Sequence, residues 1–145
     1  MDPEPRDEIK DLRAKDLLFD KELITVNEND KIQEVESLMI KKGIGGVPVI
    51  RYTSNSKKEL VGMLTHRDIE LARATINLGG MLVRDLMSHD VVTVNDNANL
   101  LEILKIMKEH NIARLPVTNK NGDLIGMIVH KNIIKKLYEI LNKSG

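Results

Sequence analysis

The chain has 145 residues, and its 22 basic and 22 acidic side chains give a formal net charge of zero. This balance argues against a dedicated nucleic-acid-binding protein, which normally carries a net basic surface. The chain has no cysteine, which excludes disulfides, thiolate metal sites and thiol nucleophiles. Its apolar runs are too short for a membrane span, and its first residues are acidic where a signal peptide is basic. We therefore expect a soluble, cytoplasmic protein without membrane contact.

The first half of the chain predicts the element order β-α-β-β-α after an N-terminal tail at residues 1–13. Apolar residues after the first strand recur at helical spacing, as Ile32, Val35, Leu38 and Met39. Asn29 or Asp30 is the expected N-cap of that helix, and Gly43 is the expected left-handed residue after it. The predicted strands cover residues 23–26, 47–50 and 60–64, and the closing helix covers residues 67–77.

The second half predicts the same order after a Gly79-Gly80 joint. Apolar residues at helical spacing are Leu100, Ile103, Leu104 and Met107. Asp96 or Asn97 is the expected N-cap of this helix, and Asn111 suits the left-handed position at its end. The predicted strands cover residues 91–94, 115–118 and 124–129, and the closing helix covers residues 131–141.

The two halves are copies of one unit. Thr25-Val26-Asn27 recurs 68 residues later as Thr93-Val94-Asn95, and Pro48-Val49 recurs at the same spacing. Gly62-Met63-Leu64 matches Gly126-Met127-Ile128 at a spacing of 64, so the first copy has four extra residues in its turn. The fold class is therefore α/β. Because a small sheet cannot cover both its faces alone, we expect the two copies to pack sheet to sheet with pseudo-twofold symmetry.

These motifs together resemble the tandem cystathionine-β-synthase (CBS) domain pair, also called a Bateman module, over about residues 14–141. The resemblance rests on Val83-Arg84-Asp85-Leu86-Met87, on the two Pro-Val strands, and on Ile24-Thr25 with its repeat copy. It rests most on residues 62–68, which match the family pattern Gly-h-x-Thr/Ser-x-x-Asp, where h is hydrophobic. Each motif is weak alone, whereas their order and duplication are specific.

The resemblance implies two CBS repeats, over residues 14–77 and 83–145, joined by a linker at 78–82. It implies a stand-alone regulatory protein that binds an adenosyl ligand in clefts between the repeats and passes the ligand's level to an unknown partner protein. The ligand is AMP, ADP, ATP or S-adenosylmethionine. We expect no catalytic cofactor, no metal and no enzymatic activity, because the chain carries none of the common nucleophile, phosphate-loop or metal-ligand motifs.

Thr65 and Asp68 lie three residues apart, where a predicted strand gives way to a predicted helix. A hydroxyl and backbone N–H groups at a helix start can bind phosphate. One carboxylate can accept hydrogen bonds from both ribose hydroxyls. The alternative is that Thr65 is only an N-cap and Asp68 only a favourable charge in the first turn. Within the recognised repeat, we favour ligand contact.

The two sites are not equivalent. In the second repeat, Val129 and Asn132 replace Thr65 and Asp68, so a phosphate contact through a hydroxyl and a charged ribose contact are both lost. In related modules, a basic residue at the position of Arg114 can reach across to the phosphate of the neighbouring site. The resemblance therefore implies one strong site that has Asp68 as its ribose anchor, and one weaker site.

The candidate ligand residues follow from the resemblance. Those of the first site are Thr25, Ile44, Gly45, Gly46, Leu64, Thr65, Arg67, Asp68, Arg114, His130 and Lys131. Those of the second, weaker site are Thr93, Ile112, Ala113, Ile128 and Asn132.

The closing helix of the second repeat carries an apolar stripe wider than one sheet needs. Its residues are Ile133, Ile134, Leu137, Tyr138, Ile140 and Leu141, and the matching helix offers Ile69, Leu71, Ala72 and Ile76. We therefore expect a homodimer joined through these helices, as is common among the resembled modules. The alternative is burial of the stripe within one chain.

Two other functions stay open on the sequence. One is a structural or interaction module whose ligand sites are vestigial. The other is a nucleic-acid-binding accessory protein, which the neutral charge and the 2% aromatic content disfavour.

Overall fold

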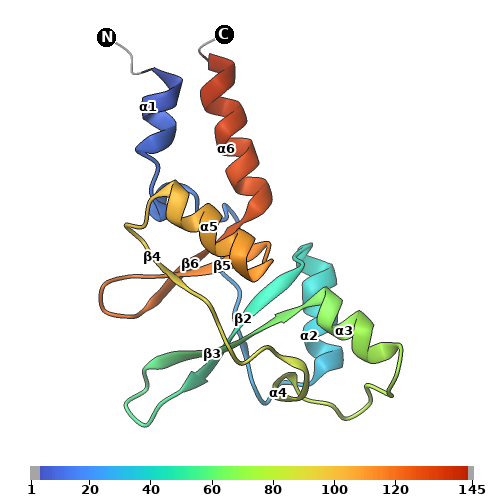
Figure 1. Cartoon of the computed structure of the whole chain (residues 1–145). Helices are drawn as coiled ribbons and strands as arrows, with labels where there is room; N and C mark the ends of the chain where they lie inside the picture. Colours follow the sequence, from blue (N-terminus) through green and yellow to red (C-terminus); the bar gives the residue numbers. More distant parts are fainter. Residues whose placement is uncertain (1–3, 144–145) are drawn as a thin grey trace. The chain divides into compact units, whose positions relative to one another are not determined.

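The computed structural model describes residues 4–143, and its contacts divide the chain into two compact units. One unit is Ile24–Val91, called here the central unit. The other joins the N-terminal residues up to Leu23 with the segment from Val92 onward, and it is called here the terminal unit. The elements of both units are labelled in Figure 1.

The central unit is a three-stranded sheet with helices. Its elements are β1 (Val26–Asn27), α2 (Ile32–Lys42), β2 (Gly46–Tyr52), β3 (Lys58–Thr65), α3 (His66–Arg73) and α4 (Val83–Leu86). The strand order is β1-β2-β3, where β1 is parallel to β2 and β3 is antiparallel to it. Val47 pairs with Leu64, which places the start of β2 beside the end of β3.

The terminal unit has a three-stranded sheet of the same arrangement, and its N-terminal segment adds a short helix and a 3-10 turn. Its elements are α1 (Pro5–Lys10), a 3-10 turn (Ala14–Asp16), β4 (Val94–Asn95), α5 (Leu100–His110), β5 (Arg114–Thr118), β6 (Leu124–Val129) and α6 (His130–Lys143). The strand order is β4-β5-β6 with the same directions. The β-α-β-β-α order predicted for each repeat is thus confirmed.

Each unit also contains a segment that lies outside its own β-α-β-β-α repeat. In the central unit, Val83 donates its amide hydrogen to the carbonyl of Asp30 at 2.9 Å, so the segment that holds α4 packs there. In the terminal unit, Ala14 donates to the carbonyl of Ala98 at 2.9 Å and Phe19 to that of Met127 at 2.7 Å. The bounds of the two contact units therefore differ from the bounds of the two sequence repeats.

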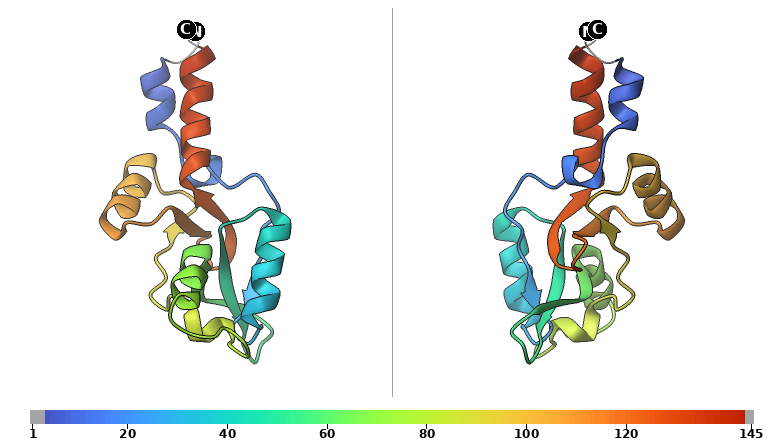
Figure 2. Two further views of the ribbon diagram at one scale, coloured as in Figure 1. Left: turned by 90° about the vertical axis from the view of Figure 1, so that its right-hand side faces the viewer. Right: turned by 90° about the vertical axis from the view of Figure 1, so that its left-hand side faces the viewer.

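The N-terminal segment, expected as a tail, contains α1. Pro5 stands at the start of this helix, where its missing N–H costs no hydrogen bond, and two acidic residues follow in the first turn. Both views of Figure 2 show α1 beside the C-terminal part of α6. There Lys143 forms an ion pair with Glu8 at 2.8 Å.

The expected helix N-caps are wrong in both repeats. The N-cap of α2 is Lys31, because Asp30 instead accepts the amide hydrogen of Asn27 at 2.8 Å and closes the turn after β1. The N-cap of α5 is Asn99, whose side chain accepts from the amide of Glu102 at 2.9 Å. At the other helix ends the expectation is confirmed, because Gly43 and Asn111 adopt the left-handed conformation with φ of 66° and 51°.

Several element boundaries also differ from the expectation, most clearly those of the first strands and of α3. The first strand of each repeat is short and begins near the end of its predicted range, because only Val26 and Asn27, or their repeat copies, pair with the neighbouring strand. Helix α3 ends at Arg73 rather than residue 77. The chain turns there, and Leu78 returns to the core with 7% of its surface exposed.

Each unit has its own aliphatic core. In the central unit, Ile32, Met39, Val47, Leu64 and Ile69 are fully buried. In the terminal unit, Ile103, Leu115 and Ile128 are fully buried, and Leu12, Ala14 and Leu17 of the N-terminal segment join them. Among residues 4–143, none of the helices is both long and apolar enough to cross a membrane.

Candidate functional site at the β3–α3 junction

The central unit joins β3 directly to α3 through a reciprocal hydrogen-bonded cap. Thr65 is the N-cap of α3, and its Oγ1 accepts from the amide of Asp68 at 3.2 Å. In return, Oδ2 of Asp68 accepts from the amide of Thr65 at 2.9 Å. Two N–H groups at the helix start are thereby satisfied. Thr65 thus is an N-cap, the role that the sequence analysis gave as the alternative to ligand contact.

The cap leaves hydrogen-bonding capacity on both side chains. A hydroxyl has one donor and two acceptor positions, and the cap uses one acceptor position of Thr65. An ionised carboxylate has about four acceptor positions, and the cap uses one position on Oδ2 of Asp68. Asp68 is therefore held in a fixed orientation and still has capacity to accept from a ligand that carries two adjacent hydroxyls.

The start of β2 lies next to this cap. Gly46 pairs with Thr65 across the two strands, and His66 donates its amide hydrogen to the carbonyl of Gly45 at 3.0 Å. Ile44 is anchored by its amide, which donates to the carbonyl of Met39 at 3.0 Å. The central unit thus brings together most of the predicted first-site residues that it contains: Ile44, Gly45, Gly46, Leu64, Thr65, Arg67 and Asp68.

These neighbours differ in what they offer to a ligand. Leu64 is fully buried, so its side chain packs in the core under the junction. Only its backbone groups could contact a ligand. Arg67 is exposed in the first turn of α3. Thr25 is half-buried and precedes β1 by one residue.

The terminal unit repeats the backbone geometry without the cap. His130 donates to the carbonyl of Ala113 at 2.9 Å, and Arg114 pairs with Val129. Val129 is buried and has no hydroxyl, so it cannot form the contact that Thr65 forms. His130 and Lys131 are exposed at the start of α6, and Ile112 donates its amide hydrogen to Met107. Ile128 is fully buried.

Asn132 has a different environment from Asp68. Its Oδ1 is buried and has no hydrogen-bond partner among the described residues. It lies in a cavity of about 130 Å³ together with Asp20 and Lys135. The hydrogen bond and charge of Lys135 hold the pKa of Asp20 below its usual value, and a hydrogen bond from Asn132 adds to this. The sequence interpretation missed Asp20, because nothing in the sequence places the N-terminal segment beside α6.

Arg114 is a half-buried cation. Burial lowers the pKa of its guanidinium below the usual value. Within residues 4–143, no carboxylate or carbonyl is recorded as its hydrogen-bond or ion-pair partner. A desolvated guanidinium without an acceptor favours an anion such as phosphate.

Thr93 is exposed and borders a cavity of about 400 Å³ between β4 and α5. The remaining lining is a mixture of polar and apolar residues that includes Asn95, Glu102 and Ile106. Thr93 does not line the cavity that contains Asn132, so these two candidate residues of the second site border different cavities.

Comparison with protein families gives the CBS domain twice, at residues 14–74 and 83–139. Among curated proteins, the chain is 36% identical over 113 residues to inosine-5'-monophosphate dehydrogenase of Korarchaeum cryptofilum. The match covers 78% of this chain and 22% of that protein. This chain thus spans less than a quarter of the dehydrogenase.

Two solved structures of similar fold contain adenosyl ligands. The CBS domain pair of protein MJ0100, in complex with 5'-methylthioadenosine and S-adenosyl-L-methionine, has a TM-score of 0.73 and 26% identity. That match covers 88% of this chain and 96% of the other. CBSX2, a CBS-pair protein of Arabidopsis thaliana, in complex with AMP has a TM-score of 0.71 and 26% identity, with 89% and 98% covered.

Proposed function

The chain belongs to the CBS-domain family, and from this premise we propose that it is a regulatory module that binds an adenosyl ligand at the β3–α3 junction. The ligand is AMP, ADP, ATP or S-adenosylmethionine. Its binding changes the state of a partner protein, and the module itself performs no catalysis.

The observation that carries this proposal is the fixed carboxylate of Asp68. The cap holds Oδ2 in place through the amide of Thr65, so the carboxylate needs no reorganisation to receive a ligand. A ribose presents two adjacent hydroxyls, which match the two oxygens of one carboxylate. The backbone of Gly45 and Gly46 lies beside it, because the carbonyl of Gly45 accepts the amide hydrogen of His66 at 3.0 Å and Gly46 pairs with Thr65.

The related structures support the ligand class. The MJ0100 domain pair binds 5'-methylthioadenosine and S-adenosyl-L-methionine, and CBSX2 binds AMP. These ligands share an adenosine group and differ at the 5' position. A site that holds the ribose and the base therefore suits all of them, and the groups around the 5' position select among them.

We assign the 5' phosphate to Arg114 in this proposal. Its half-buried guanidinium has no recorded acceptor within the described part of the chain, and burial lowers its pKa. Arg67, His130 and Lys131 are further cations of the candidate set, all located at the first turns of α3 and α6. The second site, with Asn132 in place of a carboxylate, is proposed to bind more weakly.

A thermal-shift panel of AMP, ADP, ATP, S-adenosylmethionine and 5'-methylthioadenosine tests the proposal. We expect at least one of these ligands to raise the melting temperature in a concentration-dependent manner. Inosine is a suitable control, because it keeps the ribose and changes the base. If no adenosyl ligand shifts the melting temperature, the proposal is wrong and a structural or interaction module with vestigial sites is favoured. Turnover of the bound nucleotide would also contradict it.

A further inference from the structure

The cavity at Asn132 lies within the terminal unit, between the N-terminal segment and α6. The segment contributes Asp16 and Asp20 to the lining, and α6 contributes Asn132, Lys135 and Glu139. Both views of Figure 2 show the 3-10 turn of that segment, in blue, beside the first turns of α6, in red. The volume of about 130 Å³ is far more than one water molecule needs, but it is below the roughly 300–1,000 Å³ that encloses a drug-sized ligand. The cavity therefore suits one polar part of a larger ligand.

Asn132 brings to this cavity an acceptor that has no partner. Its side-chain amide group donates to Asp20, because an ionised carboxylate can only accept hydrogen bonds. This contact determines which end of the amide is which. The other end, Oδ1, is buried, and no group of residues 4–143 donates to it. A buried carbonyl oxygen without a donor is costly, so the cavity requires a ligand or a water molecule that donates a hydrogen bond.

Asp20 is a second acceptor in the same cavity. Lys135 pairs with its Oδ2 at 3.4 Å, and both side chains are 61% exposed, so this ion pair is weak. The contacts with Lys135 and Asn132 use two of the about four acceptor positions of the carboxylate. Lys135 also holds the pKa of Asp20 below its usual value, so Asp20 is ionised at neutral pH. The carboxylate therefore has capacity for a further donor.

The segment that holds Asp20 has a counterpart in the central unit. A spacing of 69 residues relates Asp16, before Asp20, to Asp85 of α4. Asp16 accepts the amide hydrogen of Arg13 at 2.8 Å, and Asp85 accepts that of Leu82 at 2.9 Å. The same local contact therefore forms at the same position of both segments.

Both segments then pair with the third strand of a sheet. Phe19 donates its amide hydrogen to a carbonyl of β6 at 2.7 Å, and Ser88 donates to a carbonyl of β3 at 2.8 Å. The residue that follows each of these donors is Asp20 in the terminal unit and His89 in the central unit. Asp20 and His89 are therefore equivalent positions of the two units.

The two units place their carboxylates on different elements. In the central unit, the helix position carries Asp68 and the segment position carries His89. In the terminal unit, the helix position carries Asn132 and the segment position carries Asp20. The second repeat thus lacks a carboxylate on its helix and has one beside that position, on the N-terminal segment.

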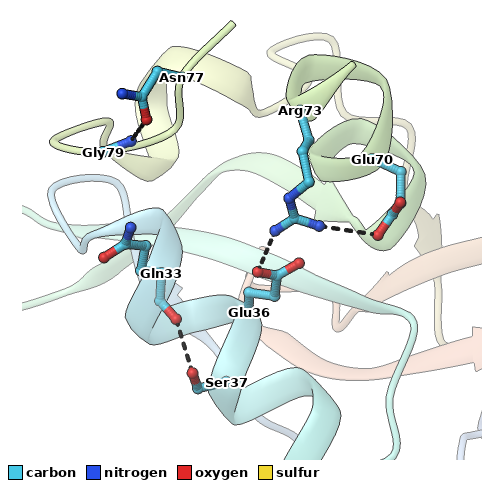
Figure 3. Close-up of polar contacts among 7 residues, drawn as sticks. All are labelled: Gln33, Glu36, Ser37, Glu70, Arg73, Asn77 and Gly79. Atoms are coloured by element: carbon cyan, nitrogen blue, oxygen red, sulfur yellow. Dashed lines mark hydrogen bonds and ion pairs between the residues drawn. The ribbon is translucent and has the colours of Figure 1, made fainter. Parts of the chain in front are cut away.

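The charged lining of the cavity is not a general feature of the repeat. At the spacing of 64 residues, Lys135 of α6 corresponds to the apolar Leu71 of α3. The ion pairs of α3 instead connect Arg73 with Glu70 and with Glu36 of α2, as Figure 3 shows. The cation that pairs with Asp20 is therefore particular to the terminal unit.

We propose that Asp20 and Asn132 together bind the two ribose hydroxyls of an adenosyl ligand, so that the second site has a charged ribose anchor from outside its own repeat. One hydroxyl donates to Oδ1 of Asn132, and the adjacent hydroxyl donates to the carboxylate of Asp20. This inference rests on the proposed adenosyl binding and adds the residue that anchors the ligand in the second repeat. The second site stays the weaker one, because Val129 has no hydroxyl and Lys135 competes for the carboxylate.

Adenosine is the probe for this inference, because all of the candidate ligands share the adenosyl group. Asp68→Ala removes the anchor of the first site, so isothermal titration calorimetry on this variant measures the second site. We expect Asp68→Ala to keep one adenosine site per chain. Adding Asp20→Asn, which keeps the size and removes the charge, should weaken that site about tenfold or more. In the otherwise natural chain, Asp20→Asn should weaken only the weaker of the two sites.

Lys135→Gln, added to Asp68→Ala, is the matched control. It removes the ion pair with Asp20 and keeps the carboxylate. Adenosine should bind this variant at least as tightly as it binds Asp68→Ala alone. A loss equal to that of Asp20→Asn would show that the ion pair only holds the N-terminal segment in place, and the inference would be wrong. Melting temperatures without ligand report whether each variant is folded.

The hydroxyl contacts are tested with 2',3'-dideoxyadenosine, which lacks both donors. It should bind Asp68→Ala about tenfold or more weakly than adenosine does, and this difference should shrink in the D20N/D68A variant. Loss of all adenosine binding in Asp68→Ala would overturn the inference, as would an affinity that Asp20→Asn leaves unchanged. Equal affinities for the two nucleosides would also overturn it and would indicate that water fills the cavity. The proposed function fails separately, if wild type responds to no ligand of the thermal-shift panel.

Discussion

Thr65 and Asp68 cap one another at the start of α3, with the amide of each residue bonded to the side chain of the other at 2.9 and 3.2 Å. The same pair that starts the helix therefore also fixes the carboxylate assigned to ribose. Helix capping and ligand binding are not competing interpretations of this motif, because the cap uses only part of the hydrogen-bonding capacity.

The first prediction concerns the affinity of the Asp68→Ala variant. Removing a charged acceptor costs about 1.5–3 kcal/mol of binding free energy. Isothermal titration calorimetry should therefore show the affinity for the preferred adenosyl ligand falling about ten- to a hundredfold. Asn132→Ala should cost clearly less, because a neutral hydrogen bond contributes about 0.5–1.5 kcal/mol.

Asp85→Ala is a matched control for that experiment. Asp85 accepts the amide hydrogen of Leu82 at 2.9 Å, a contact like that of Asp68 with Thr65, but at the start of α4. Both variants thus lose a capping contact in the central unit. If Asp85→Ala weakens binding as much as Asp68→Ala, the effect is one of stability and the ribose assignment is wrong.

The second prediction concerns the phosphate selectivity of Arg114. Arg114→Ala should weaken the binding of AMP more than that of adenosine, because only AMP gives the guanidinium an anionic partner. The difference between the two ligands should be about tenfold or more. Both ligands should be measured on wild type and on Arg114→Ala. A general loss of stability would lower both affinities alike and would leave their ratio unchanged. Equal weakening of AMP and adenosine would show that Arg114 does not contact the phosphate.

The third prediction concerns Gly62, which lies against the segment that follows α4. A Cβ at Gly62 would come within 2.8 Å of the carbonyl oxygen of Ser88 and 2.6 Å of Sδ of Met87. That carbonyl is fixed, because it accepts from the amide of Met63 at 3.1 Å. Gly62→Ala should therefore reduce the free energy of unfolding by about 1–3 kcal/mol in urea denaturation.

Gly126→Ala is the repeat-related comparison for Gly62→Ala. Its Cβ would meet the side chain of Leu18, with a nearest approach of 2.9 Å, and a flexible side chain can move aside. This variant should lose less stability than Gly62→Ala. Equal losses would contradict the fixed position of Ser88 against β3.

The fourth prediction concerns acid stability. The hydrogen bond from Arg51 holds the pKa of Glu28 below its usual value, and the nearby positive charges add to this. A lowered folded-state pKa contributes stability above the unfolded pKa, and this contribution is lost as the pH falls through the folded value. The melting temperature of Glu28→Gln should therefore fall less than that of wild type as the pH decreases below about 4.5.

Glu34→Gln serves as the control for this titration. Glu34 is an exposed carboxylate of α2 that forms no ion pair with another of the residues 4–143. Its variant should follow the wild-type profile. A Glu28→Gln profile identical to that of wild type would show that the Arg51 contact does not contribute to stability.

Local chemistry explains which elements the sequence could predict. The strand and helix order of each repeat follows from its apolar spacing, and the left-handed ends at Gly43 and Asn111 follow from residue type. The N-caps were mispredicted because several Asn and Asp residues stand before each helix. Only the tertiary structure decides which of them closes a turn, as Asp30 does, and which caps the helix, as Asn99 does.

The sequence by itself determined the repeat, the family and the difference between the Thr65-x-x-Asp68 motif and its Val129-x-x-Asn132 counterpart, because these depend on residue identity and order alone. Only the tertiary structure decided which segments share a core. It places the N-terminal segment with the second repeat's sheet and α4 with the first, and it sets Asp20 beside Asn132. Such contacts join residues that are far apart in the chain. Burial of apolar surface decides which segments pack together, and local sequence patterns do not indicate which segments these are.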